Sequence, residues 1–295
     1  MVKQYAIALS GGGFKIGYEV GALTKLHEIG IIPSYITGTS AGALVAGYLA
    51  QAHNSQEYKI RLFELTDLIM NLKQTDIFTA PNDVFAKIYQ LVKFGGLYNT
   101  LPLYELICDK VNPNEIMNNN FIRFEVGAVD LESGIYATVS NNSLRVQIHE
   151  GIYSSCIQPI FMIMGNPWAD GGVRHITPLG NAYDYIRLFP QPLDWRIICI
   201  VPHSKYPKNW KFKRNLISIA SRTLEILLNE INENDLKLAE AYDLTRMCVP
   251  RYIIRPDVPL NINPLQFNKA RMKEAFNQGY DDALSFIKNH PAILE

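Results

Sequence analysis

The sequence predicts an α/β fold with a mainly parallel central sheet, and its N-terminal part carries most of this prediction. Residues 5–9 form a nearly continuous apolar run that ends at three consecutive glycines, which is the pattern of a buried parallel strand. Apolar residues at helical spacing then continue as far as Gly30, which is a typical helix stop. A second strand is expected at 35–37 and a small apolar helix at 43–52. This alternation is typical of parallel strands that are joined by right-handed crossovers.

The rest of the chain continues the alternation. Further helices are expected at 57–72, 84–94, 104–111, 214–243 and 267–287. Further strands are expected at 121–129, 135–139, 197–201 and 252–254, the first two paired around a turn. In the long helix, one face should be apolar and the charges and asparagines should lie in solvent; the apolar face would consist of Ile217, Ala220, Leu224, Leu227 and Ile231. No repeat or linker divides the chain, so one domain over residues 1–295 is expected.

The charge balance restricts the kinds of partner. The chain has 28 Lys and Arg and 28 Asp and Glu, for a formal net charge of +0. Without a basic excess, nucleic acid is not an expected partner, and any membrane contact should be local, apolar and peripheral. No apolar run has the length of a transmembrane helix and no signal peptide is separable from the first strand, so a cytoplasmic protein is expected.

The cysteines do not indicate a disulfide framework or a metal site. Cys108, Cys156, Cys199 and Cys248 are widely spaced and form no C-x-x-C pair. They are interpreted as reduced core residues of an intracellular protein. Neither a metal nor another cofactor is expected.

The segment Gly38-Thr39-Ser40-Ala41-Gly42 lies where a predicted strand meets a predicted helix. It has the G-x-S-x-G pattern of a nucleophile elbow, a turn so tight that its flanking positions must be nearly free of side chains. Such a turn exposes the serine hydroxyl, and the N-terminus of the following helix favours negative charge nearby. Ser40 is therefore a candidate nucleophile, and the alternative is a structural turn.

The glycine loop Gly11-Gly12-Gly13 can present backbone N–H groups to one anion. It could be a phosphate cradle for a dinucleotide or an oxyanion hole for acyl transfer. The dinucleotide fingerprint fails, because Ile16 occupies its last glycine position when counted from Gly11. A third interpretation is a glycine turn that only packs a strand against a helix.

The candidate base is Asp170, followed by Gly171 and Gly172. The two glycines would let this segment approach the serine, and burial among Phe161, Met164 and Trp168 would raise the pKa of the carboxyl towards the range of a base. The alternative is an ordinary Asp-Gly turn. A Ser-Asp-His triad is less consistent with the sequence. Ser40 follows only two strands, which is too early for the α/β-hydrolase topology. None of the histidines lies in a sequence context that indicates a catalytic base; they are His27, His53, His149, His175, His203 and His290.

Taken in order, SGGGFK, GTSAG and DGG resemble the motifs of the patatin-like phospholipase family. Segments 95–103, 127–131 and 154–161 extend the resemblance over nearly the whole chain. It implies a three-layer α/β/α fold, Ser40 as nucleophile, Asp170 as base and Gly11 to Gly13 as oxyanion hole. Supporting roles fall to Lys15, Gly38, Gly42, Gly171 and Gly172. Lys15 stands where the family usually has arginine and Ile16 where it usually has glycine.

The resemblance implies a lipid acyl hydrolase of the phospholipase or lysophospholipase type, with a lipid or ester substrate. An acyl groove is expected from residues 161–164 or 84–94, the second of which could instead be an interfacial lid or plain core. Two other functions share these motifs. One is a lipid-binding module with weak catalysis, and the other is a transacylase in which an alcohol replaces water.

Overall fold

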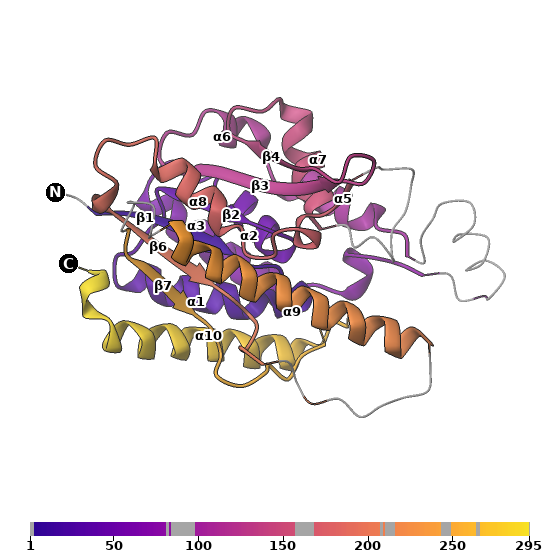
Figure 1. The fold of residues 1–295 in the computed structure, drawn as a ribbon. Coiled ribbons are helices and arrows are strands. Elements are labelled where there is room, and N and C mark those ends of the chain that lie inside the picture. Colours follow the sequence, from indigo (N-terminus) through magenta and orange to yellow (C-terminus); the bar gives the residue numbers. More distant parts are fainter. Residues whose placement is uncertain are drawn as a thin grey trace.

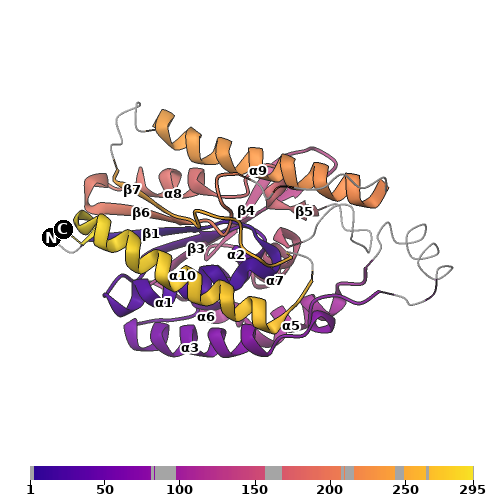
Figure 2. The same cartoon turned by 90° about the horizontal axis from the view of Figure 1, so that it is seen from below.

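The computed structural model describes residues 3–80, 83, 98–156, 168–206, 209, 216–242, 249–263 and 266–294. Within these residues, the chain forms one seven-stranded sheet with helices on both faces (Figures 1 and 2). The strands are β1 (Gln4–Leu9), β2 (Tyr35–Gly38), β3 (Arg123–Asp130), β4 (Tyr136–Ser140), β5 (Trp168–Asp170), β6 (Trp195–Ile200) and β7 (Arg251–Ile254). The helices are α1 (Ile16–Glu28), α2 (Ala41–Leu49), α3 (Ser55–Asn71), α5 (Leu101–Lys110), α6 (Pro113–Met117), α7 (Arg145–Ser155), α8 (Leu179–Ile186), α9 (Leu216–Tyr242) and α10 (Lys269–Asn289).

The sheet is mainly parallel, as the sequence predicts. Its order is β4-β3-β2-β1-β6-β7, and β5 pairs with β3 beside this path. β3, β2, β1, β6 and β7 run parallel to their neighbours, whereas β4 and β5 are antiparallel to β3. β1 is central, so the loop after it lies between the ends of β2 and β6.

The two faces of the sheet carry separate hydrophobic clusters, which makes the fold three-layered. Along β1, Ile7 and Leu9 belong to the larger cluster, together with α1, α2, α3 and α10. Ala6 and Ala8 belong to the smaller cluster under α8 and α9. This alternation follows from the period of two of a strand. Figure 2 shows α8 and α9 on one side of the sheet and α1, α3 and α10 on the other.

Helices α1 and α10 approach so closely that glycine is required at their contact. A Cβ atom at Gly21 would lie 2.0 Å from the carbonyl oxygen of Phe276, and one at Gly279 would lie 2.0 Å from that of Tyr18. Glycine therefore lets the two backbones touch. This packing holds α1, and with it the glycine loop at its N-terminus, against the body of the protein.

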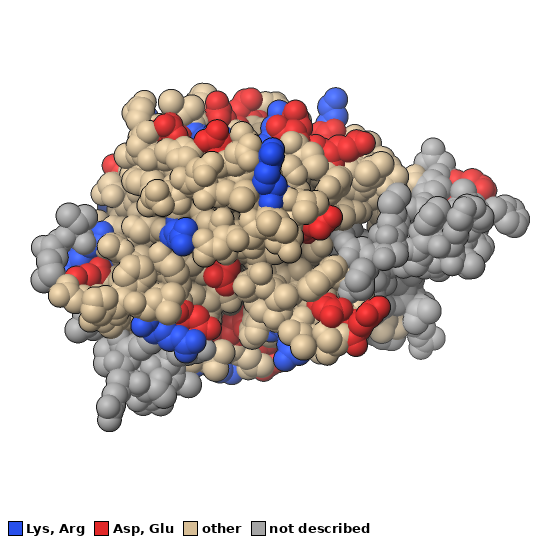
Figure 3. All heavy atoms as spheres, turned by 90° about the horizontal axis from the view of Figure 1, so that it is seen from above, with Lys and Arg blue, Asp and Glu red and all other residues tan. Residues whose placement is uncertain are grey.

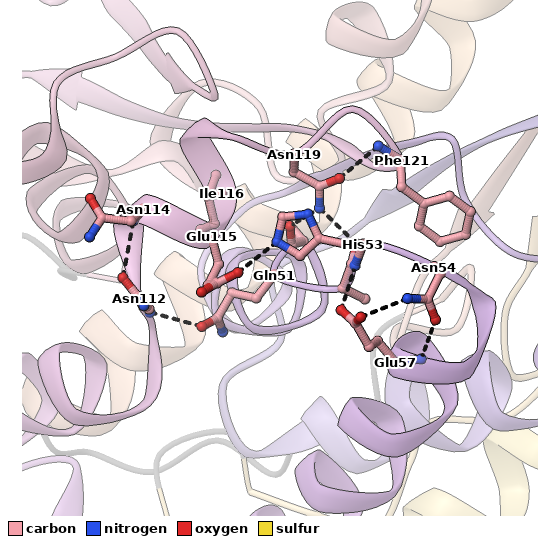
Figure 4. A network of polar contacts seen from close by, with 12 residues as sticks. Gln51, His53, Asn54, Glu57, Asn112, Asn114, Glu115, Ile116, Asn119 and Phe121 are labelled. Carbon is pink, nitrogen blue, oxygen red and sulfur yellow. Dashed lines mark hydrogen bonds and ion pairs between the residues drawn. The ribbon is translucent and has the colours of Figure 1, made fainter.

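A polar network fixes the opposite end of α2 from the serine turn (Figure 4). The buried amide of Asn119 donates to the carbonyls of Ala50 and Ala52, at 2.6 and 2.7 Å, and its oxygen accepts from the N–H groups of Phe121 and Ile122. Nearby, His53 pairs with Glu115 at 2.6 Å. The side chain of Asn119 thereby satisfies carbonyls that the helix end leaves unpaired.

Most predicted elements are present, with boundaries moved by a few residues. The sequence prediction missed α6, α7, α8 and β5. The helix predicted at 104–111 begins earlier, at Leu101, because Pro102 is tolerated in the first turn. The helix predicted at 84–94 lies outside the described residues.

Two predictions about burial were wrong. Cys108 is exposed and not a core residue. In α9, Leu227 is exposed, whereas Asn232 and Asp235 are buried. Two polar side chains of this helix therefore point inward, where they meet His175 and Thr177 instead of solvent.

No helix in the described ranges is long and apolar enough to cross a membrane. On the face drawn in Figure 3, acidic and basic side chains are scattered and neither sign gathers into a large patch.

Candidate active site

Ser40 lies in a strained turn between β2 and α2. Its backbone has φ 54° and ψ −123°, and among the described residues it is the one non-glycine position with positive φ. Such a conformation costs about 1–3 kcal/mol and persists only where surrounding contacts enforce it. Here the Thr39 N–H donates to the carbonyl of Leu9 at 3.2 Å, and the Gly42 N–H donates to the carbonyl of Thr39 at 2.9 Å. The geometry is that of a nucleophile elbow.

The flanking glycines are sterically required. A Cβ atom at Gly38 would lie 2.2 Å from the carbonyl oxygen of Gly42. One at Gly42 would lie 2.6 Å from the carbonyl oxygen of Leu9. The small residues around Ser40 therefore allow β2 to turn directly into α2 against the end of β1.

The glycine loop follows β1 and lies against the serine turn. A Cβ atom at Gly11 would approach the Cβ of Ser40 to 3.1 Å. The Gly11 N–H donates to the carbonyl of Ile176 at 2.8 Å and is therefore already used. In the described part of the chain, the N–H groups of Gly12 and Gly13 donate to no backbone carbonyl. Gly13 has φ 55°, a conformation that favours glycine. Two N–H groups of the loop are thus available to an anion.

Lys15 and His203 form a hydrogen-bonded chain to the backbone of this loop. Lys15 Nζ lies 3.0 Å from His203 Nδ1, and His203 Nε2 lies 2.6 Å from the carbonyl oxygen of Gly11. An ammonium can only donate and a carbonyl can only accept, so the imidazole accepts at Nδ1 and donates from Nε2. Burial, reinforced by the charge of Lys15, lowers the pKa of His203 to about 3. Burial also lowers the pKa of Lys15 to about 8. No local pattern around His203 predicts these contacts.

Asp170 ends β5 and is buried, with an exposed fraction of 2%. One of its carboxylate oxygens accepts from the N–H of Gly172 at 2.7 Å. A Cβ atom at Gly171 would lie 2.4 Å from the carbonyl oxygen of Gly127 and 3.3 Å from the side chain of Thr39. The aspartate turn is therefore packed against the serine turn. Of the neighbours predicted for Asp170, Phe161 and Met164 lie outside the described residues, as do both predicted groove segments, 84–94 and 161–164.

The segment that follows Asp170 joins the three motifs. The carbonyl of His175 accepts from the hydroxyl of Thr39 at 3.0 Å. The carbonyl of Ile176 accepts from the N–H of Gly11 at 2.8 Å. One short segment thus contacts both the serine turn and the glycine loop.

The C-terminal end of α7 holds the backbone of Ser40 from another side. Ser40 N–H donates to the Ser155 hydroxyl at 3.1 Å, and the Cys156 thiol donates to the Ser40 carbonyl at 3.2 Å. Burial raises the pKa of the Cys156 thiol, and the nearby charge of Asp170 raises it further. Cys156 is therefore a neutral donor that lies close to both Ser40 and Asp170. Neither residue was predicted to have this role.

Across the described ranges, no group of three or more His, Cys, Asp or Glu side chains is placed to hold a metal ion.

The fold and the site define an α/β protein with a nucleophile-elbow serine, beside a glycine loop at the end of the central parallel strand. The family model described as patatin-like phospholipase matches residues 7–183, and the chain belongs to this family. The match includes the glycine loop, Ser40 and Asp170.

Known proteins with similar sequences match only in part. The chain is 39% identical over 89 residues to triacylglycerol lipase ptl3 of Schizosaccharomyces pombe, covering 30% of this chain and 17% of that protein. It is 24% identical over 199 residues to the omega-hydroxyceramide transacylase of Mus musculus, covering 62% of this chain and 30% of that protein. The chain thus spans less than a third of the length of either relative. The crystal structure of VipD from Legionella pneumophila aligns with 98% of this chain and 67% of that one, at TM-score 0.48 and 14% identity.

Proposed function

We propose that this protein is a lipid acyl hydrolase in which Ser40 and Asp170 act as a catalytic dyad. The observation that carries the proposal is the packing of three motifs on one another. Gly11 lies against Ser40, and Gly171 lies against Thr39. Membership of the patatin-like phospholipase family supports the same chemistry.

In the first step, Ser40 attacks the ester carbonyl as Asp170 takes the hydroxyl proton. A serine hydroxyl needs such a base, and a carboxylate in a buried setting is a stronger base than one in water. We assign the oxyanion contacts to the N–H groups of Gly12 and Gly13, because Gly11 already donates to Ile176. Gly11 then contributes by letting the loop approach the serine. Fixed donors of this kind stabilise the charge that develops in the transition state.

In the second step, Asp170 donates the proton to the leaving alcohol and the acyl group remains on Ser40. Asp170 then takes a proton from water, which attacks the acyl-enzyme and releases the fatty acid. If an alcohol takes the place of water, the same intermediate gives a transacylase. Both reactions use the same residues, and the mouse relative that is named a transacylase is a reason to test both.

We propose acylglycerols and phospholipids as the substrate classes. The fission yeast relative is named a triacylglycerol lipase, and the family model is described as patatin-like phospholipase. The formal net charge of +0 provides no general attraction for anionic head groups, so neutral and zwitterionic lipids are the first to test.

The test uses the wild-type protein and Ser40→Ala side by side. Each is incubated with p-nitrophenyl esters, with a panel of triacylglycerol, phosphatidylcholine and lysophosphatidylcholine, and with a fluorophosphonate probe. We expect hydrolysis and probe labelling by the wild type and neither by Ser40→Ala, with equal melting temperatures. A wild-type protein that binds lipid vesicles but does not react with the probe would instead indicate a lipid-binding module.

A further inference from the structure

The C-terminal half of α9 buries two polar side chains where a helix on a sheet would normally bury apolar ones. Asn232 has an exposed fraction of 0% and Asp235 one of 6%. They lie three residues apart and therefore on one face of the helix. Burying a carboxylate and an amide is costly unless hydrogen bonds compensate for the lost water. Their partners therefore indicate what the helix does here.

The Asn232 amide nitrogen donates to Glu233 on the same helix at 3.3 Å. The other hydrogen-bond partners lie in the segment that follows Asp170. One oxygen of Asp235 pairs with His175 Nδ1 at 2.9 Å, and the other accepts from the N–H of Thr177 at 3.0 Å. The Thr177 hydroxyl donates to the side-chain oxygen of Asn232 at 2.6 Å. The segment 175–177 is thus held through two side chains and one backbone N–H.

The same segment contacts both the serine turn and the glycine loop. Its His175 carbonyl accepts from Thr39, the residue before Ser40, and its Ile176 carbonyl accepts from Gly11. A shift of the segment would move both turns relative to each other. A neighbouring α9 residue, Glu233, pairs with Arg255 at 2.8 Å, and Arg255 donates to the carbonyl of His203 behind the glycine loop.

We infer that Asp235 and Asn232 are positioning residues, which set the glycine loop and the serine turn through residues 175–177. The expected effect on kcat rests on the proposed hydrolase function. The effect on the position of the two turns does not depend on it. Asp235 acts through backbone and does not touch the substrate. An apolar pair at these positions would pack against the segment but would not fix its carbonyls in one direction.

The test compares Asp235→Ala and Asp235→Asn with two controls on the same helix. Leu236→Ala removes a buried apolar side chain from the adjacent position, and Asn234→Ala changes an exposed one. We expect Asp235→Ala to lower kcat for a p-nitrophenyl ester between about tenfold and a hundredfold, with KM changed less than about threefold, because small displacements of catalytic groups have effects of this size. Asp235→Asn retains one acceptor and should recover most of the rate. Both controls should retain kcat, even where Leu236→Ala lowers the melting temperature.

A second readout does not depend on catalysis. In Asp235→Ala, the Gly11 amide should exchange its hydrogen with solvent faster than in Leu236→Ala, because its acceptor at Ile176 is no longer held. If the wild type has no esterase activity, the proposed function fails while this exchange still tests the positioning role. If Asp235→Ala does not fold, Thr177→Val removes only the bond to Asn232 and should show the same changes in smaller degree.

Three outcomes would overturn the inference. One is equal loss of kcat in Asp235→Ala and Leu236→Ala at equal loss of thermal stability, which would indicate general destabilisation. The second is unchanged kcat together with unchanged Gly11 exchange in Asp235→Ala. The third is an inactive His175→Ala together with an active Asp170→Asn. This result would make His175 the general base of a triad, with Asp235 as the carboxylate that orients it.

Discussion

Lys15 and His203 are in direct contact although 188 positions separate them in the chain, with Lys15 Nζ 3.0 Å from His203 Nδ1. The other imidazole nitrogen donates to the Gly11 carbonyl at 2.6 Å. Lys15 therefore reaches the loop through a histidine, and we propose that this pair fixes the direction of the glycine loop.

Removing the lysine amine should weaken catalysis without unfolding the protein. In Lys15→Met the apolar stem remains, but His203 loses its donor and the Gly11 carbonyl is held less firmly. We expect kcat to fall about tenfold, with a small change in KM. Lys25→Met, in helix α1 that begins directly after Lys15, is the control and should retain wild-type kcat. Steady-state kinetics that show equal losses for both variants would contradict the bracing role.

The neutral state of His203 should make the protein less stable in acid. Its folded pKa is lowered to about 3, whereas in the unfolded chain it lies near 6.5. The unfolded state therefore binds one more proton between these values, and the stability present above pH 6.5 is lost as the pH falls towards 3. At pH 5 this amounts to about 2 kcal/mol at most. His203→Gln should show a smaller drop in melting temperature from pH 7 to pH 5 than the wild type, and an equal drop would refute the assignment.

Glu19 should have the opposite pH dependence. It is fully buried in α1, and within the described part of the chain neither carboxyl oxygen has a hydrogen-bond partner. Burial raises its pKa well above 4.5. A raised carboxyl pKa stabilises the fold fully at low pH, and this contribution is lost as the pH rises through the folded value. Glu19→Gln should therefore reduce the fall in melting temperature between pH 5 and pH 8.

The control for this experiment is Glu28→Gln on the same helix. Glu28 accepts from Lys25 and Tyr280, and the Tyr280 hydroxyl is the larger cause that lowers its pKa. Its substitution should not reduce the fall at alkaline pH. If both glutamate variants flatten the profile equally, burial of Glu19 is not the cause.

Local patterns were sufficient to predict the parts of this site that a short segment specifies. The elbow was predictable because Gly38 and Gly42 must both lack side chains for the turn to close, and this requirement is contained within five consecutive residues. The first two strands and the helices after them were predictable for the same reason, because each is a short run with its own apolar pattern.

The remaining features depend on contacts between distant segments. His203 is half-buried by elements that are distant in the chain, so no local pattern predicts its contacts. Asp235 lies among charged and polar residues, a pattern that is typical of a solvent-exposed helix face. Helix α7 has few apolar positions, chiefly Ile148 and Ile152, so its periodicity was too weak to predict a helix whose end holds Ser40. Local patterns therefore predicted the turns that carry Ser40 and Asp170 but not the distant residues that contact the serine turn and the glycine loop.

Replacing Asp170 should test the identity of the base. In Asp170→Asn the amide keeps the shape of the side chain but cannot take a proton, so we expect kcat to fall by about three orders of magnitude or more. The double variant with Ser40→Ala should be little worse than either single variant, because the two residues act as a unit. An active Asp170→Asn would contradict the dyad, and the activity of His175→Ala would then show whether the imidazole that pairs with Asp235 is the base.

At Gly12 in the glycine loop, an added side chain would meet a neighbour without straining the backbone. Gly12 has φ −164°, which any residue can adopt, but a Cβ atom there would lie 2.7 Å from the Cγ of Pro202. The methyl group of Gly12→Ala must therefore displace the loop and the two N–H groups that we assign to the oxyanion. Loss of one oxyanion donor raises the barrier by about 2.7–4 kcal/mol, and we expect an effect of this size on kcat with a much smaller change in melting temperature. Gly180→Ala, where the added methyl group meets nothing within 4 Å, is the control and should leave kcat unchanged.

Adding NAD or ATP during the melting experiments tests the alternative that the glycine loop is a phosphate cradle. A nucleotide-dependent rise of several degrees in a protein without esterase activity would contradict the oxyanion-hole assignment.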